Sequence, residues 1–194
     1  CDNLLEKLSF TKKRWIGMLG GNHSFFIVDK KLGKKTSVHS DKYLADELKC
    51  EYLGACSKID LTLTSGKKSA SIGIIAHHGV GGGATVGGPI NRVVKMLDAW
   101  DADIALMGDN HQRAALPVRD KLITARINSE DVLYHRTQWA IRTGGFQRSY
   151  VPGIESYVVD KCMNPSSLGV VVLNLTLMVD KRTGFPYIKV QVTQ

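Results

Sequence analysis

Side chains that can bind metal ions follow three separate apolar segments of the chain. The three groups are Asn22-His23, His77-His78 and Asp109-Asn110-His111. Each comes at or just after a small residue, where an apolar run stops. Loops at the carboxyl ends of sheet strands can direct side chains toward a common point, so we expect these groups to converge. Imidazole, carboxylate and amide ligands together suit Mn, Fe, Zn or Ni.

Such a set of ligands indicates hydrolysis of a phosphate ester. Two divalent ions about 3.5–4 Å apart can clamp a phosphoryl group and generate a hydroxide nucleophile at neutral pH. A histidine beside the leaving oxygen can supply the proton that the leaving group needs. We therefore expect two divalent metal ions as cofactors and a phosphate ester as the substrate.

The ordered set of motifs resembles the later motifs of the calcineurin-like metallophosphoesterases, in particular phage and bacterial members. The segments that carry the resemblance are Gly20-Gly21-Asn22-His23, His78-Gly79, the glycine-rich loop 79–89, Gly108-Asp109-Asn110-His111 and Thr143-Gly144-Gly145-Phe146. The resemblance covers nearly the whole chain. It implies hydrolysis of a phosphomonoester or phosphodiester by metal-bound hydroxide, with nucleic acid among the substrates.

The resemblance also implies a role for individual residues. Asn22 and His78 would bind the second metal, His111 would bind the first, and His23 would be the catalytic proton donor. Asp109 stands where the family has a histidine that binds the second metal. A carboxylate there can bind a metal and shifts the preference toward Mn or Mg, or it can mark a weakened site. Among these ions we favour Mn.

Asn110 and Arg113 are expected to contact the substrate. Arg113, Arg142 and Arg148 can each pair with phosphate oxygens in the bidentate manner of guanidinium groups, and each can equally be a surface arginine. Ser24 replaces the acidic residue that usually follows the Gly-Asn-His motif.

The D-x-H and G-D motifs that complete such a site are not found ahead of Gly20. We therefore expect an N-terminal segment or a second polypeptide to supply them. The alternative is a phosphoesterase-fold protein that has lost catalysis and acts as a binding or structural subunit.

The residue pattern predicts an α/β chain, which we interpret as one domain over residues 1–194. It would be the C-terminal portion of a metallophosphoesterase β-sandwich flanked by helices, incomplete without an upstream segment. Apolar runs and alternation predict strands, and 3.6-residue spacing predicts helices. The strands are expected at Trp15–Leu19, Ile59–Thr64, Ser71–Ala76 and Ile104–Met107, and the helices at 2–13, Tyr43–Leu48 and Pro89–Trp100. Two hairpins are expected, Lys121–Ile127 with Asp131–Ala140 and Leu168–Val179 with Tyr187–Val190.

The composition limits the class of protein. The net charge of +8 arises from 26 Lys and Arg against 18 Asp and Glu and favours polyanionic partners, including nucleic acid. No run of about 18 apolar residues is present, so no membrane span is expected. The four cysteines form no CxxC pair, which indicates reduced thiols and a cytoplasmic protein, although Cys50 and Cys56 could form a disulfide.

Overall fold

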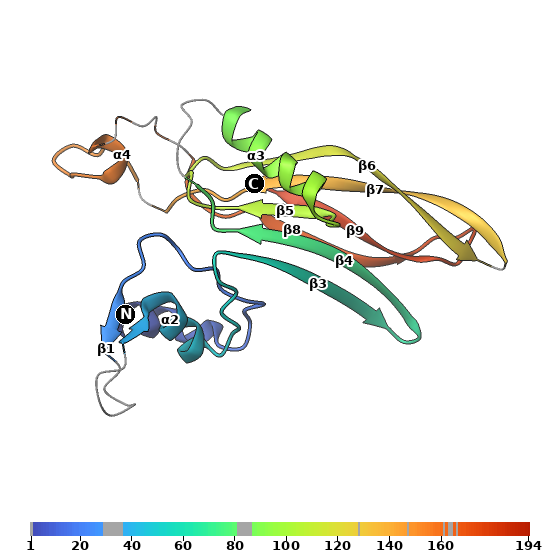
Figure 1. Cartoon of the computed structure of the whole chain (residues 1–194), viewed down its shortest axis with the longest axis horizontal. Helices are drawn as coiled ribbons and strands as arrows, with labels where there is room; N and C mark the ends of the chain where they lie inside the picture. Colours follow the sequence, from blue (N-terminus) through green and yellow to red (C-terminus); the bar gives the residue numbers. More distant parts are fainter. Residues whose placement is uncertain are drawn as a thin grey trace. The chain divides into compact units, whose positions relative to one another are not determined.

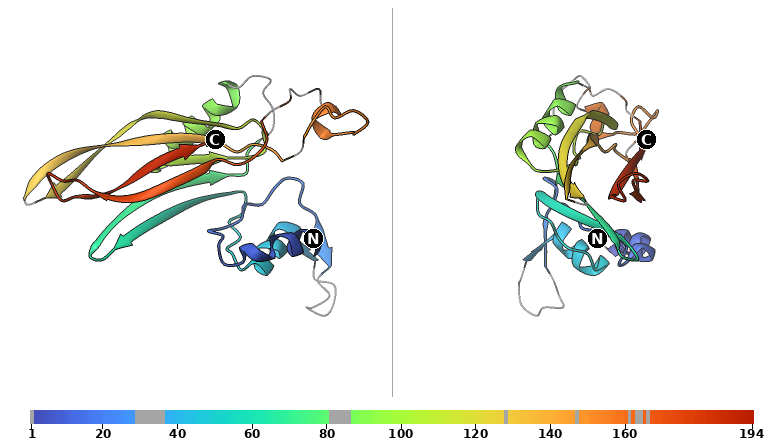
Figure 2. Two further views of the ribbon diagram at one scale, coloured as in Figure 1. Left: turned by 180° about the vertical axis from the view of Figure 1, so that it is seen from behind. Right: turned by 90° about the vertical axis from the view of Figure 1, so that its right-hand side faces the viewer.

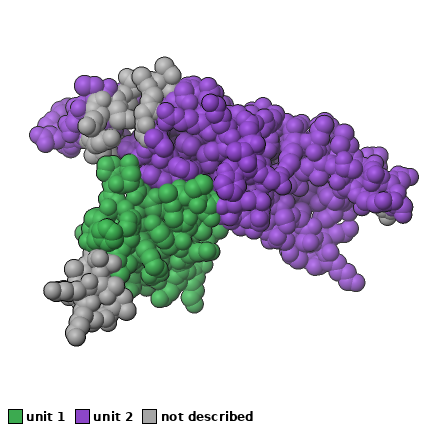
Figure 3. Space-filling view, viewed as in Figure 1, with its two compact units in different colours: residues 1–57 green, residues 58–194 purple. Residues whose placement is uncertain are grey.

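The structure is a computed structural model that describes residues 2–28, 37–80, 87–127, 129–146, 148–160, 162, 165 and 167–194. The chain divides into two compact units, residues 1–57 and residues 58–194 (Figure 3). Most of the glycine-rich loop 79–89 that contributes to the resemblance, residues 81–86, lies outside the described residues. The sequence predicted one domain over residues 1–194. Whether the two units form one domain depends on how they are arranged relative to each other, so this stays a prediction.

Unit 1 contains short helices and a two-stranded antiparallel sheet. Its elements are α1 (Asp2–Leu8), the 3-10 helix η1 (Ser9–Thr11), β1 (Phe26–Val28), β2 (Ser37–His39) and α2 (Ser40–Leu48). Helix α2 is capped at its C-terminal end by Lys49. The left-handed backbone of Lys49 lets its N–H reach the carbonyl oxygens of Ala45 and Asp46. The helix predicted at Tyr43–Leu48 is therefore confirmed.

The buried strand predicted at Trp15–Leu19 is wrong. Only Met18 makes a strand-like contact, an isolated parallel bridge to Tyr52. Ile16 is 61% exposed and Trp15 is 36% exposed. Backbone hydrogen bonds join Met18 to Glu51 and Leu53, and Gly20 to Gly54. The first residues of the run are exposed, so the run has no buried face and does not form a buried strand.

Unit 2 is built on a five-stranded mixed sheet with the strand order β3-β4-β5-β7-β6. Strand β5 is parallel to both of its neighbours, whereas β6 and β7 form a long antiparallel hairpin. The elements are β3 (Cys56–Ser65), β4 (Lys68–His77), α3 (Gly87–Ala99), β5 (Ile104–Met107), β6 (Ala114–Ile127), β7 (Glu130–Arg142), α4 (Tyr157–Asp160), β8 (Val172–Val179) and β9 (Pro186–Thr193). None of the described helices is long and apolar enough to cross a membrane.

The two faces of this sheet are covered by different elements (Figure 1). Helix α3 packs Ile90, Val93 and Leu97 on one face, against Ile75 and Ala105 of the sheet. The β8–β9 hairpin covers the other face, where both hairpin strands contribute to a second apolar cluster around the buried Ile188. Figure 2 shows the helix and the hairpin on opposite sides of the sheet. The predicted α/β class, a β-sandwich flanked by a helix, is confirmed for this unit.

Candidate metal centre

His78 and Asp109 are brought together by the parallel pairing of β4 with β5. The register aligns His77 with Met107, so the residues that follow the two strands leave the same edge of the sheet. His78 Nε2 lies 3.7 Å from Asp109 Oδ1, and both side chains are largely buried, at 24% and 12% exposure. Two of the residues predicted to bind metal are therefore in contact.

The close approach of the two loops depends on glycine. Gly79 has a φ of +114°, and a Cβ added there would lie 2.4 Å from the carbonyl oxygen of Gly108. The same atom would lie 2.9 Å from Asp109 Cβ. A Cβ on Gly108 would in turn lie 2.8 Å from the carbonyl oxygen of His78. Any side chain at either position would push the loops apart, because the nearest atoms belong to the backbone.

The loop after β5 holds two residues in strained backbone conformations. Asp109 has a φ of 64° and His111 a φ of 57°. The Asn110 N–H donates to the Gly108 carbonyl oxygen at 2.8 Å, which closes a three-residue turn around Asp109. Turns of this hand are rare and strained, and strained backbone gathers at binding and catalytic sites. This geometry fixes the direction of the Asp109 Cα–Cβ bond.

Asp109 is only partly satisfied by its protein neighbours. Its Oδ2 is buried and has no hydrogen-bond partner among the described residues, whereas Oδ1 faces His78. A buried carboxylate oxygen without a donor costs free energy unless a cation or water fills the position. Across the described ranges no three His, Cys, Asp or Glu side chains gather into a metal-binding group. Within the described ranges, one carboxylate and one imidazole meet here.

The side chains of His111 and Asn110 have different surroundings. The His111 side chain lies against the backbone of Gly145, where an added Cβ would be 3.2 Å from His111 Cβ and Cγ. Asn110 is 3% exposed, and its Oδ1 accepts a hydrogen bond from Arg142 Nη1 at 2.9 Å. The loop after β7 thus supports the loop after β5.

Arg142 is fully buried, which the sequence does not indicate. Its Nε and Nη2 have no hydrogen-bond partner in the part of the chain that the structure describes, and burial lowers the pKa of its guanidinium. An arginine with no exposed surface is not placed to clamp a substrate phosphate, so its visible role is to hold Asn110. The sequence predicted this strand to end at Ala140, whereas β7 continues to Arg142 and pairs there with the end of β5.

The other two arginines, Arg113 and Arg148, have different surroundings from Arg142. Arg113 lies beside segment 167–170, with Nη1 at 3.5 Å from the Val170 carbonyl oxygen. Arg148 is exposed.

Asn22 and His23 belong to unit 1, on a loop held by its own backbone. Gly20 N–H donates to the Gly54 carbonyl oxygen at 2.8 Å, and Gly21 N–H donates to Asp41 Oδ2 at 2.7 Å. Both Asn22 and His23 are exposed. Their convergence with the residues of unit 2 stays a prediction.

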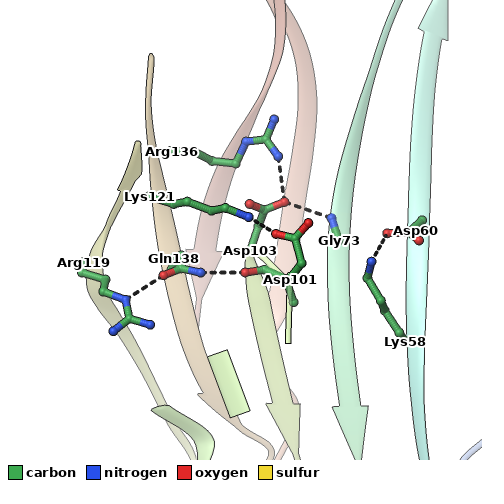
Figure 4. A network of polar contacts seen from close by, with 10 residues as sticks. Lys58, Asp60, Gly73, Asp101, Asp103, Arg119, Lys121, Arg136 and Gln138 are labelled. Carbon is green, nitrogen blue, oxygen red and sulfur yellow. Dashed lines mark hydrogen bonds and ion pairs between the residues drawn. The ribbon is translucent and has the colours of Figure 1, made fainter. Parts of the chain in front are cut away.

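A second polar network lies at the opposite end of β5, and sequence reasoning did not find it. Asp103 is 3% exposed, and its Oδ2 accepts hydrogen bonds from Arg136 Nη1 at 2.8 Å and Gly73 N–H at 3.0 Å (Figure 4). Lys121 pairs with Asp101 on the surface beside it. These contacts tie β4, β5 and β7 together where β5 begins, which fixes the strands that carry the candidate metal centre.

Comparisons with known proteins give one similar structure. Neither a protein-family model nor a curated protein sequence matches this chain. Among solved structures, a crystal structure of a Vps29 single mutant from Entamoeba histolytica is similar with a TM-score of 0.30 and 14% sequence identity. The match covers 92% of this chain and 97% of that chain. A TM-score of 0.30 does not separate a shared fold from a chance likeness, so what this chain does has to be inferred from its own residues.

Proposed function

We propose that this chain carries part of the site of a calcineurin-like, metal-dependent phosphoesterase that hydrolyses a phosphomonoester or a phosphodiester. The observation that carries the proposal is the His78–Asp109 pair. The two side chains follow adjoining parallel strands and meet at 3.7 Å, and no described residue donates a hydrogen bond to the buried Asp109 Oδ2. The order of the motifs along the chain supports the same function.

The donors at this position fit a divalent ion that accepts both nitrogen and oxygen. A carboxylate in place of a second imidazole favours Mn over Zn. Divalent ions bound here would polarise the phosphate and supply a hydroxide nucleophile at neutral pH. The turn at Asp109 fixes the backbone that carries the carboxylate, which lowers the cost of ordering this loop when the ion binds.

The remaining roles follow the order of the motifs. His23 protonates the leaving oxygen, Asn22 and His111 complete the metal ligands, and Arg113 contacts the substrate. Asn110, which is 3% exposed and bonded to Arg142, supports the turn rather than contacting the substrate as the sequence predicted. The net charge of +8 supports a polyanionic substrate such as nucleic acid, because positive charge raises the rate of encounter with phosphates.

Two contacting donors are too few for a stable two-metal site. Metal ions in catalytic sites have at least three protein ligands each, or share bridging carboxylates. We propose that the missing carboxylates and imidazoles come from a separate segment or polypeptide that carries the D-x-H and G-D motifs.

One observation favours a second candidate function, a binding or structural subunit without catalysis. His78 already lies within ion-pair distance of Asp109. A protonated His78 would neutralise the carboxylate without any metal. In that case the pair would stabilise the loops rather than bind an ion.

Metal binding and turnover of the purified chain separate the two functions. We expect Mn²⁺ to bind in calorimetric titrations and bis-p-nitrophenyl phosphate to be hydrolysed once the missing motifs are supplied in trans. His78→Ala should abolish turnover and weaken Mn²⁺ binding by at least about tenfold, since even residues that only support a ligand contribute about that much.

The matched control is His135→Ala. His135 is an exposed histidine of β7 that lies 3.5 Å from Asp120, outside the candidate metal centre. It should leave both readouts unchanged. If the wild-type chain binds no Mn²⁺ and shows no turnover with the second segment present, the enzymatic proposal fails and the binding subunit is supported.

A further inference from the structure

A cavity of about 320 Å³ lies between β7 and β9 in unit 2, away from the candidate metal centre. Four aromatic side chains line it: Tyr134, Trp139, Phe185 and Tyr187. Tyr134 and Arg142 are both on β7, separated by roughly 26 Å at about 3.3 Å per residue. The cavity is therefore a distinct feature of the fold, and nothing in the proposed phosphoesterase reaction uses it.

One wall of the cavity is rigid. Asp180 Oδ1 accepts hydrogen bonds from the N–H and hydroxyl groups of Thr183, at 2.7 and 2.8 Å, which closes the turn between β8 and β9. The Tyr134 hydroxyl lies 3.0 Å from Thr183 Oγ1, and its ring stacks on Phe185 at a centroid distance of 4.3 Å. An aromatic wall held in this way loses little entropy when a ligand binds.

The charged groups around the cavity are mostly basic. Arg136 and Lys189 line it, against the carboxylate of Asp180. The Asp180 carboxylate is occupied by its turn, and hydrogen bonds from Thr183 hold its pKa below the usual value. Arg136 is paired with Asp103. Lys189 makes no ion pair within the described part of the chain, so its ammonium group is available to an anion.

We propose that this cavity binds a nucleobase, with the attached phosphate near Lys189. A volume of about 320 Å³ is at the lower end of the range of about 300–1,000 Å³ for ligand pockets, which suits one planar ring system. Aromatic walls stack with any base, and a neighbouring cation pairs with the phosphate. The base can belong to a free nucleotide or to a single-stranded nucleic acid.

Fluorescence of Trp139, which lines the cavity, reports binding directly. A Trp15→Phe/Trp100→Phe variant leaves Trp139 as the only tryptophan, and both replaced residues are partly exposed, at 36% and 45%. This variant is titrated separately with AMP and with a short oligothymidylate. Quenching by AMP assigns a free nucleotide to the cavity, and quenching by the oligothymidylate alone assigns a single-stranded nucleic acid. Either result supports the proposal.

Two substitutions test the assigned contacts. Lys189→Gln should weaken binding by about fivefold. It should also reduce the slope of log K against log salt concentration by about one, as expected for the loss of one phosphate contact. Tyr187→Leu keeps a similar apolar volume but removes a ring, and should weaken binding by about tenfold if the base stacks there. Circular dichroism of each variant verifies that the fold is kept.

The matched control is Lys95→Gln, which removes the same charge from α3 on the opposite face of the sheet. It should leave binding unchanged. Equal weakening by Lys95→Gln and Lys189→Gln would mean that binding follows net charge alone and would overturn the proposal. The proposal would also be overturned if neither AMP nor the oligothymidylate quenched Trp139 fluorescence. It would be overturned as well if a tyrosine-containing peptide, titrated in the same way, were the only probe that quenched it. None of these readouts depends on metal or on phosphoesterase activity.

Discussion

Replacing Gly79 with alanine tests the geometry of the candidate metal centre most directly. Gly79 has a φ of +114°, which side chains rarely adopt, and its Cβ would lie 2.4 Å from the Gly108 carbonyl oxygen. The obstructing atoms are backbone atoms at the end of β5. They cannot rotate away as a flexible side chain would, so the two loops must separate.

The expected loss of stability has two parts. The unfavourable backbone conformation costs about 1–2 kcal/mol, and the steric overlap adds about 1–3 kcal/mol, as overpacking does in protein cores. Together they lower the free energy of unfolding by about 2–5 kcal/mol. At a typical urea slope of about 2 kcal/mol per molar, the midpoint of denaturation falls by roughly 1–2.5 M.

Gly184→Ala provides the control for the backbone part alone. Gly184 also has a positive φ, of 71°, but no atom lies within 4 Å of its added Cβ. It should cost only about 1 kcal/mol. If the two alanine variants lose the same stability, the loops after β4 and β5 do not abut as described, and the reasoning about the His78–Asp109 pair fails with it.

Two further predictions concern buried and titrating groups. Asn110→Ala should lower the free energy of unfolding by about 2–3 kcal/mol, because the buried Arg142 loses its hydrogen bond. The double variant Asn110→Ala/Arg142→Met should regain most of that loss, because it also removes the buried charge. If urea denaturation shows an equal loss of stability in both variants, this prediction is contradicted. Asp180→Asn should lower the melting temperature at neutral pH. Hydrogen bonds from Thr183 lower the folded-state pKa of Asp180, so its contribution is present above the unfolded-state pKa of about 3.9 and is lost as pH falls through the lower folded value. The difference between wild type and variant in thermal melts should therefore shrink below about pH 4, and a difference that grows in acid would refute the assignment.

Local sequence patterns determined most of the elements of unit 2. The run Ile104–Met107 is β5 with the predicted bounds, and the helix predicted from Pro89 is α3, which begins at Gly87. The alternation predicted at Ile59–Thr64 appears in the burial pattern of β3. Hydrophobic periodicity records which face of an element is buried, and that information is local in the chain. The same reasoning failed at Trp15–Leu19, where the apolar run pairs only around Met18 and its first residues are exposed.

The sequence by itself also identified the residues of the candidate metal centre, through their type and their place after apolar runs. Only the tertiary structure decided that His78 meets Asp109, because this depends on β4 and β5 being parallel neighbours. It likewise decided that Arg142 is buried against Asn110 rather than exposed to a substrate. Strand order and register determine which distant residues meet, and they arise from the packing of whole elements, which no local spacing specifies.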